Sequence, residues 1–197
     1  MNKKVVIFLA EGFEEVEAVT PIDYLRRVDI EVVSVSIGAS VFVNGSHGIQ
    51  LKADTTLAEL EAENSLKPAL WDAVILPGGM PGAVNLAASA ELPAFLKSMA
   101  ASNKWVCAIC ASPALVLAPL GLLKGKTFTC YPGLEEKVQG ASCSGARTVV
   151  DKAPEGGGLI TGKAAGATGE FAIAIIEQLI GKPEAKSLAA KVLLGQS

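Results

Sequence analysis

Residues 105–113 read Trp-Val-Cys-Ala-Ile-Cys-Ala-Ser-Pro, and this stretch decides the fold. Its first five residues are all apolar, which predicts a strand that is buried on both faces. A Cys-Ala-Ser-Pro turn then ends the strand, and Pro113 suits the first turn of a helix that we expect to run to about Leu120. The stretch therefore indicates one strand-to-helix unit of an α/β protein.

Further buried runs alternate with helical patterns along the rest of the chain. Strands are predicted at residues 3–10, 30–37, 72–76, 127–130, 148–151 and 159–161, with a small hairpin over 41–51. Helices are predicted at 13–28, from Pro81 onward, and at 92–101, 166–180 and 185–194. The helix over 13–28 has a predicted apolar face of Phe13, Val16, Val19, Ile22 and Leu25. We expect a single α/β domain over residues 1–197, with a mostly parallel sheet between two layers of helices.

Composition excludes several classes of function. Half of the 197 residues are apolar and the formal net charge is −3, so we do not expect a nucleic-acid partner, which needs a basic face. No stretch approaches the roughly 18 apolar residues of a membrane span, and the apolar run near the N-terminus is too short for a signal peptide. Four cysteines are too few for a disulfide scaffold, so we expect a cytoplasmic protein with reduced thiols.

The chain has one histidine, His47. A metal site built from several histidines is therefore excluded, and a Ser-His-Asp or Cys-His triad must use this residue. His47 lies in the predicted hairpin region, where we expect a surface or packing role. We expect neither a metal nor an organic cofactor.

Cys110 lies at the predicted strand-to-helix junction. If its amide and those of Ala111 and Ser112 point into the first helical turn, an anion is favoured there and the pKa of the thiol falls. Cys110 is then a nucleophile or an oxidation sensor, and the alternative is a small buried hydrophobic residue. The alternative fits Cys107 better, because it lies inside the strand and ahead of the turn that a C-x-x-C redox pair needs.

Two other strand ends carry candidate residues, and ligands of parallel sheets bind at such ends. The amides of Gly78 and Gly79, which follow Pro77, can donate to a developing oxyanion, and the alternative is a plain turn. Glu17 borders the apolar face of the helix predicted at 13–28. If it points toward Cys110, burial raises its pKa, and it can donate to a thiolate or act as a general base. The alternative is a solvated position, which is what we expect for Glu14 and Glu15.

Four segments taken together resemble the ThiJ/PfpI superfamily. They are Ala-Glu-Gly-Phe-Glu-Glu-Val-Glu at 10–17, Leu-Pro-Gly-Gly-Met-Pro-Gly-Ala at 76–83, Ala-Ile-Cys-Ala-Ser-Pro at 108–113 and Gly-Glu-Phe-Ala at 169–172. The resemblance extends over residues 3 to about 195 and is greatest to the branch of the Parkinson-disease-associated protein deglycase. It implies a flavodoxin-like three-layer α/β/α sandwich and a homodimer.

The resemblance also implies roles for individual residues. Cys110 matches the nucleophile on a strained elbow, and Glu17 matches the buried acid that hydrogen-bonds it. The positions that match the oxyanion site are Gly78, Gly79 and the amide of Ala111. Those that match the lining of the pocket and the dimer contact are Arg27 and Ala165.

The chain departs from that branch at two places. Tyr131-Pro132 stands where the human-type branch has a histidine before a proline, and a tyrosine can donate a hydrogen bond but is a poor base at pH 7. Cys130 places a second thiol beside that position. Ala111 stands where the protease-like branches have a histidine, which disfavours peptidase and amidotransferase activity.

We therefore expect a cofactor-independent glyoxalase or deglycase that acts on methylglyoxal or glyoxal and their adducts through Cys110, as the resemblance implies. The alternative is a non-enzymatic redox sensor and chaperone. In that case Cys110 is oxidised to a sulfinate, which Glu17 and the helix amides stabilise.

Overall fold

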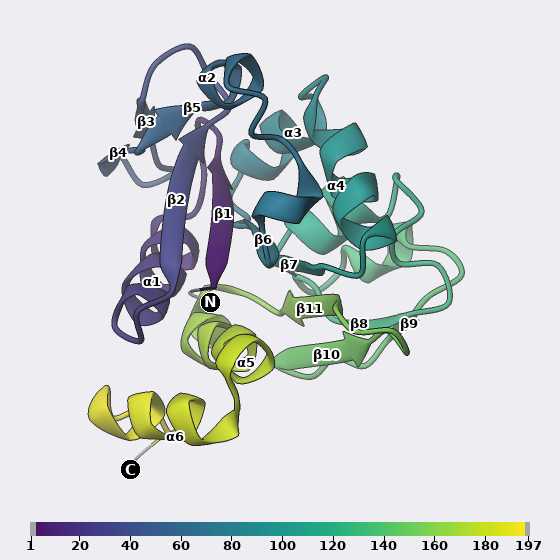
Figure 1. Ribbon diagram of the computed structural model, residues 1–197. Helices are drawn as coiled ribbons and strands as arrows, with labels where there is room; N and C mark the ends of the chain where they lie inside the picture. Colours follow the sequence, from purple (N-terminus) through teal and green to yellow (C-terminus); the bar gives the residue numbers. More distant parts are fainter. Residues whose placement is uncertain (1–2, 196–197) are drawn as a thin grey trace.

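A seven-stranded sheet runs through the centre of the computed structural model, which describes residues 3–195 (Figure 1). The strands lie in the order β10-β11-β7-β6-β1-β2-β5. Their bounds are β1 Lys4–Leu9, β2 Glu31–Ser36, β5 Thr55–Thr56, β6 Ala73–Leu76, β7 Trp105–Ile109, β10 Thr148–Lys152 and β11 Gly158–Gly162. All neighbours are parallel except β10, which is antiparallel to β11. The prediction of a mostly parallel sheet is confirmed.

Helices cover both faces of this sheet, which confirms the three-layer arrangement. One layer holds α1 (Glu15–Arg26), α5 (Thr168–Ile180) and α6 (Lys182–Lys191), and the other holds α2 (Leu57–Ala62), α3 (Gly82–Ala87) and α4 (Leu92–Ala101) (Figure 1). Single turns of 3₁₀-helix lie at Pro68–Leu70, Glu135–Lys137 and Ala165–Ala167. None of the helices within residues 3–195 is long and apolar enough to cross a membrane.

Two pairs of short strands lie outside the central sheet. The predicted hairpin is present as β3 (Phe42–Asn44) and β4 (Gln50–Lys52), which are antiparallel. The second pair is β8 (Thr127–Phe128) and β9 (Ser142–Cys143), which are parallel. The strand predicted over 127–130 therefore ends two residues early, and Cys130 follows it in an irregular segment.

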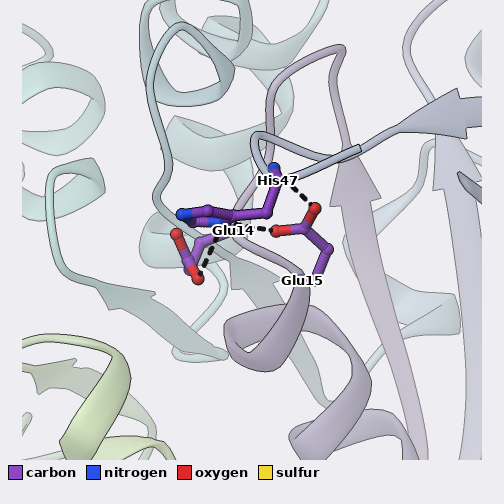
Figure 2. A group of neighbouring side chains, drawn as sticks. All are labelled: Glu14, Glu15 and His47. Atoms are coloured by element: carbon purple, nitrogen blue, oxygen red, sulfur yellow. Dashed lines mark hydrogen bonds and ion pairs between the residues drawn. The ribbon is translucent and has the colours of Figure 1, made fainter. Parts of the chain in front are cut away.

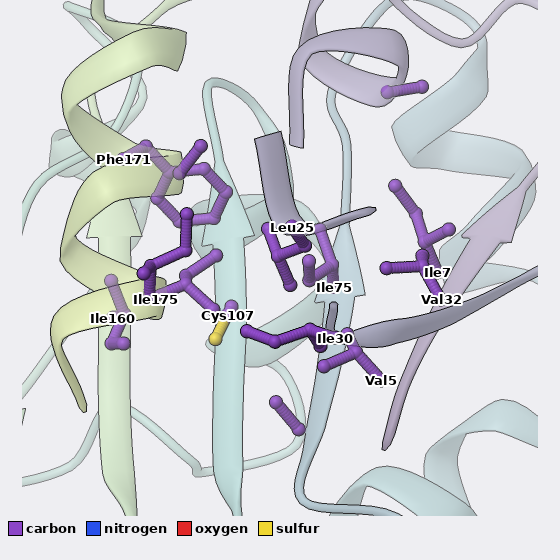
Figure 3. Packing of buried hydrophobic residues seen from close by; sticks show 14 of the residues in the cluster. Val5, Ile7, Leu25, Ile30, Val32, Ile75, Cys107, Ile160, Phe171 and Ile175 are labelled. Carbon is purple, nitrogen blue, oxygen red and sulfur yellow. The ribbon is translucent and has the colours of Figure 1, made fainter. Parts of the chain in front are cut away.

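The continuous apolar runs form strands because side chains alternate between two buried faces. In β1, Val5 and Ile7 pack beneath α1 and α5, whereas Val6 and Phe8 pack against the opposite layer. Figure 3 shows the first of these cores, in which Phe171 and Ile175 of α5 and Leu25 of α1 lie over the sheet. Burying a side chain of this size stabilises the fold by about 1.5–3 kcal/mol.

The apolar face predicted for the first helix is wrong in its first two turns. Val16 and Val19 are 47% and 45% exposed, whereas Glu15 and Glu17 are buried. The first turn of α1 packs at the carboxyl edge of the sheet, where polar backbone groups are available as partners. The helix predicted from Pro113 is a short π-helix, Pro113–Leu117, which is followed by turns.

The strand order of the sheet reverses at β1. The chain passes from β1 to β2 on one side and later places β6 and β7 on the other side. A crevice forms outside the carboxyl ends of the strands at such a point. The segments that follow β1, β6 and β7 therefore meet in space, which is where the candidate residues were expected.

Candidate active site

Cys110 directly follows β7 and turns the chain into the π-helix. Its φ is 63°, in the left-handed region that non-glycine residues rarely adopt and that costs of order 1–3 kcal/mol. Two backbone hydrogen bonds hold this turn: the amide of Cys110 donates to the carbonyl of Gly162 at 2.9 Å, and its carbonyl accepts from the amide of Tyr131 at 2.8 Å. The turn presents the thiol at the carboxyl edge of the sheet.

Glu17 lies on α1 and is fully buried. Its Oε2 accepts a hydrogen bond from the amide of Gly78 at 2.8 Å. Its Oε1 is buried and has no hydrogen-bond partner among residues 3–195. Burial is the main cause that raises the pKa of Glu17 to about 7, and the charge of Glu14 acts in the same direction. Glu17 is therefore a buried carboxyl that exchanges its proton near neutral pH, rather than a solvated acid.

Gly78 lies against both the Cys110 side chain and the Glu17 carboxyl. A methyl group on Gly78 would lie 2.7 Å from the Cβ of Cys110 and 2.8 Å from Oε2 of Glu17. Such distances are far inside van der Waals contact, so only glycine allows the two side chains to approach this turn. The neighbouring Gly79 has a φ of 89°, which side chains rarely adopt. The Pro77-Gly78-Gly79 segment is thus more than a plain turn.

The pKa predicted for Cys110 is wrong in its direction. Burial, followed by the negative charge of Glu17, raises the pKa of the thiol to about 12. The amides of Gly79 and Ala111 lower it, as expected of donors that face the sulfur, but they do not prevail. When Glu17 is protonated its charge no longer opposes the thiolate, and its O–H can donate to the sulfur. The two groups therefore titrate as a pair.

A cavity of about 560 Å³ opens at Cys110. Its lining residues are Glu14, Gly79, Met80, Cys110, Ala111, Leu115, Tyr131, Pro132, Gly133, Leu134 and Lys137. Most of these offer apolar or backbone atoms, and the two charged side chains are Glu14 and Lys137. A pocket of this volume and lining can hold a small organic molecule next to the sulfur.

The structure brings together most of the residues that the sequence singled out. Cys110, Gly79, Ala111 and Tyr131 line the cavity, while Glu17 lies buried beside Gly78. The hydroxyl of Tyr131 makes no hydrogen bond within the described chain, and the side chain is 51% exposed.

Three expected pocket residues do not line this cavity. Cys130 is buried in the core, where its thiol donates to the carbonyl of Tyr131 at 3.5 Å. Ala165 follows β11 at the same edge of the sheet but lies outside the lining. Arg27 lies just past the far end of α1, pairs with Asp23 at 2.7 Å and lines a separate cavity against α6. A crossover helix carries its last turn to the opposite edge of the sheet, so within one copy of the chain Arg27 is not a pocket residue.

His47 is an exposed loop residue, as expected, but it contacts two acids at the start of α1 (Figure 2). Its Nδ1 lies 3.0 Å from Oε2 of Glu15 and 3.6 Å from Oε1 of Glu14. Glu15 also accepts from the amides of His47 and Ile49 at 2.7 and 3.3 Å. Gly45 leaves room for this carboxylate, because a Cβ there would overlap it.

The interpretation of Glu15 as a solvated residue is therefore wrong. Burial acts to raise its pKa, but the hydrogen bonds from His47 and Ile49 prevail and lower the pKa to about 2. Glu14, Glu15 and His47 each offer one possible metal-ligand atom, and these atoms lie within 4.8 Å of one another. The hydrogen bonds already account for this grouping.

Ser112 is a site residue whose role the sequence did not indicate. It is fully buried, and its hydroxyl donates to the carbonyl of Pro77 at 2.5 Å, which ties the Cys110 turn to the end of β6. A serine at a predicted helix start is usually a cap for that helix, so local sequence suggests a different partner. Only the neighbouring positions of β6 and β7 in the sheet bring the two segments together.

The fold and the site define an α/β/α protein with a cysteine on a strand-to-helix elbow and a buried acid beside it. The chain matches the DJ-1/PfpI family over residues 3–178, and it belongs to that family. It is 41% identical over 191 residues to protein DJ-1 homolog B of Arabidopsis thaliana, covering 97% of this chain and 41% of that protein. It thus spans under half the length of that relative.

Two further relatives are similar in length to this chain. Protein dj-1beta of Drosophila melanogaster is 33% identical over 195 residues, with 98% of each protein covered. The solved structure of oxidized Toxoplasma gondii DJ-1 superposes with a TM-score of 0.89 at 37% identity, covering 98% of this chain and 99% of that one. The resemblance found in the sequence is confirmed.

Proposed function

We propose that the chain is a cofactor-independent glyoxalase or deglycase that acts on methylglyoxal, glyoxal and their adducts through Cys110. The observation that carries this proposal is the pairing of a thiol on a strained turn with a buried carboxyl at the edge of one cavity. A nucleophile and a proton carrier are the two groups that the isomerisation of a 2-oxoaldehyde requires.

The first step is addition of the sulfur of Cys110 to the aldehyde carbon. The S–C bond forms, the π electrons of the carbonyl pass to its oxygen, and the thiol proton is carried by the Glu17 carboxylate to that oxygen, which leaves Glu17 ionised again. The amides of Gly79 and Ala111 lower the pKa of the thiol, which indicates that they face the sulfur. From that position they can also donate to the carbonyl oxygen as it becomes negative. The product is a hemithioacetal.

The second step moves a proton from the former aldehyde carbon to the neighbouring carbonyl carbon. Glu17, with a pKa of about 7, can accept the first proton and return the second. The hemithioacetal thereby becomes a thioester of a 2-hydroxy acid. Water then breaks the C–S bond, so methylglyoxal and water give lactate and the free thiol. A deglycase reaction enters the same steps from a hemithioacetal or hemiaminal adduct.

The test is formation of lactate from methylglyoxal by purified wild type, Cys110→Ser, Glu17→Ala and the conservative variant Glu17→Gln. We expect lactate from the wild type alone at a rate above the buffer reaction. A wild-type rate no better than that of Cys110→Ser would reject the enzyme. Cys107→Ser is the matched control, because Cys107 is buried in β7.

A second candidate function is redox sensing at the same cysteine. The thiol of Cys110 is partly exposed, and one structural neighbour is a DJ-1 protein described as oxidized. Oxidation by peroxide to the sulfinate adds two oxygen atoms, and the amides that face the sulfur can donate to the resulting anion. Intact mass after mild peroxide distinguishes this role. A single two-oxygen step that is lost in Cys110→Ser supports it, and modification spread over all four cysteines opposes it.

We also propose that the chain is a homodimer and works in a reducing compartment such as the cytoplasm. Val16 and Val19 expose apolar surface on α1, and Ile49, 61% exposed, adjoins that helix through its hydrogen bond to Glu15. A second copy would cover this surface. All four cysteines are free thiols, which supports a reducing compartment. Sedimentation of the wild type and of Val19→Glu tests the dimer, which the charged variant should disrupt.

A further inference from the structure

Apart from Cys107 in β7, two cysteines lie outside the chemistry proposed for Cys110. Cys130 is buried just after β8, and Cys143 is exposed in β9. The parallel pairing of these strands places Phe128 opposite Cys143, and the amide of Ser144 donates to the carbonyl of Phe128 at 2.9 Å. Cys130 follows Phe128 by two residues, in the irregular segment after β8, and its thiol lies close to that of Cys143.

The two thiols interact. A hydrogen bond and the charge of Cys143 are among the causes that raise the pKa of Cys130, after its burial. The β8–β9 pairing thus brings a shielded thiol and an accessible thiol together. An exposed thiol next to a buried one is the arrangement of an oxidisable residue and its resolving partner.

We propose that Cys130 and Cys143 form a reversible disulfide under peroxide, as a second redox site distinct from Cys110. Peroxide first transfers one oxygen to the exposed thiol of Cys143, giving a sulfenic acid and water. The sulfur of Cys130 then attacks the sulfenic sulfur, so the S–S bond forms and a second water leaves. Each disulfide consumes one peroxide, and a small thiol reverses the bond by exchange.

The bond acts on the wall of the Cys110 cavity. Tyr131, the residue after Cys130, lines that cavity, and its amide donates to the carbonyl of Cys110. A disulfide holds its two Cα atoms about 4.4–6.8 Å apart. Closing the bond therefore fixes the Tyr131 segment relative to β9. The second redox site thereby changes access to the thiol of Cys110.

The bond can be detected without involving Cys110. Cys110→Ser is treated with equimolar hydrogen peroxide, and its tryptic peptides are mapped without reduction. Trypsin cuts after Lys126, Lys137 and Arg147, so Cys130 and Cys143 fall in the separate peptides 127–137 and 138–147. We expect these two peptides to be joined with the loss of two hydrogen atoms. The same treatment of the double variant Cys110→Ser/Cys143→Ser should join none.

The effect on the cavity is measured in the wild type. Diamide, an oxidant that adds no oxygen to Cys110, forms the bond, and the rate of iodoacetamide alkylation at Cys110 is followed before and after. We expect the rate to change by a factor of about three or more, and not to change in Cys143→Ser. The proposal is overturned if peptides 127–137 and 138–147 stay separate, or if the wild type links Cys130 to the peptide 105–124 instead. Both results are independent of lactate formation, so they do not depend on the enzyme proposal.

Discussion

Glu17 and Cys110 meet at Gly78: the Gly78 amide donates to Oε2 of Glu17 at 2.8 Å, and the space where a Gly78 side chain would begin is 2.7 Å from the Cβ of Cys110. The acid comes from the helix after β1, the thiol from the turn after β7, and the glycine from the end of β6. Three segments from different parts of the chain must therefore be correctly placed before Glu17 and Cys110 can interact. The glycine between them is the position at which the pair is most easily disturbed.

We expect Gly78→Ala to damage both stability and reactivity. The added methyl group must displace the Cys110 side chain, the Glu17 carboxyl or the amide of Ala111, and overpacking of this kind costs about 1–3 kcal/mol. Urea unfolding measures the first effect, and iodoacetamide labelling of Cys110 measures the second. Gly38→Ala is the control, because its methyl group would meet only Ser36 at 3.6 Å. Equal behaviour of the two variants would show that the space at Gly78 is not needed.

Glu17→Gln tests the titration of the buried acid through protein stability. The folded pKa of Glu17, about 7, lies above its ordinary value of 4.5, so folding favours the protonated form. The wild type is then most stable, as far as Glu17 is concerned, below pH 4.5, and it loses this contribution as the pH rises from 4.5 to 7. The loss amounts to about 3 kcal/mol.

The measurement compares urea unfolding of the wild type and Glu17→Gln at pH 5 and pH 8. Glutamine keeps an acceptor for the amide of Gly78 and carries no proton to lose. The difference in unfolding free energy between the variants should move in favour of glutamine by about 2–3 kcal/mol from pH 5 to pH 8. His47 also titrates in this window, but it is present in both proteins and cancels. A difference that does not vary with pH would contradict a raised pKa for Glu17.

Much of the sheet and the identity of the central site residues could be predicted from sequence. The strands β1, β2, β6 and β7 are buried on both faces, so a run of mostly apolar residues identifies each of them in the sequence. The missed elements include α2, a helix of six residues, and the two-residue strands β5 (Thr55–Thr56) and β9 (Ser142–Cys143). Elements this short have too few residues to show a hydrophobic periodicity.

The orientation of α1 could not be predicted for a different reason. Helical spacing shows which side chains lie on the same side of a helix, but not whether that side faces the core or the solvent. In α1, Val16 and Val19 are exposed, whereas Glu15 and Glu17 are buried. The partners that make these buried acids tolerable are the amides of Gly78, His47 and Ile49, which belong to distant segments. Helical position left Glu17 either buried or solvated; it is buried, as the resemblance implied, and its partner is the amide of Gly78 after β6.

The single histidine allows a direct test of the loop that holds Glu15. The hydrogen bond to Glu15 and the charges of Glu14 and Glu15 raise the pKa of His47 above its ordinary value of 6.5. One imidazole Hε1 resonance should therefore titrate by NMR with a midpoint above 6.5 in the wild type, and closer to that value in Glu15→Gln. Because His47 is 69% exposed, added salt should also lower the wild-type midpoint.

We expect Glu15 to contribute to the stability of the protein toward acid. Glu15 has a pKa lowered to about 2, so its stabilisation is complete above pH 4.5 and is lost as the pH falls toward 2. Glu15→Gln should consequently unfold at a higher pH than the wild type during acid titration followed by circular dichroism. Glu63→Gln, on the exposed end of α2, is the matched control. An unchanged acid midpoint in Glu15→Gln would mean that the contacts to His47 and Ile49 contribute nothing to folding.

Tyr131→Phe decides whether the tyrosine takes part in proton transfer. The ring of Tyr131 lines the cavity, but its hydroxyl has no hydrogen-bond partner in the part of the chain that the structure describes. Glu17, by contrast, has a pKa of about 7 and stands next to the sulfur. We therefore expect Tyr131→Phe to keep kcat/KM for methylglyoxal within about twofold, whereas a lost general acid lowers the rate by about 10²-fold or more. The comparison variant is Tyr24→Phe on α1, which removes the other tyrosine hydroxyl away from the cavity. A large loss confined to Tyr131→Phe would assign the proton donor to the tyrosine and leave Glu17 only the task of controlling the ionisation of Cys110.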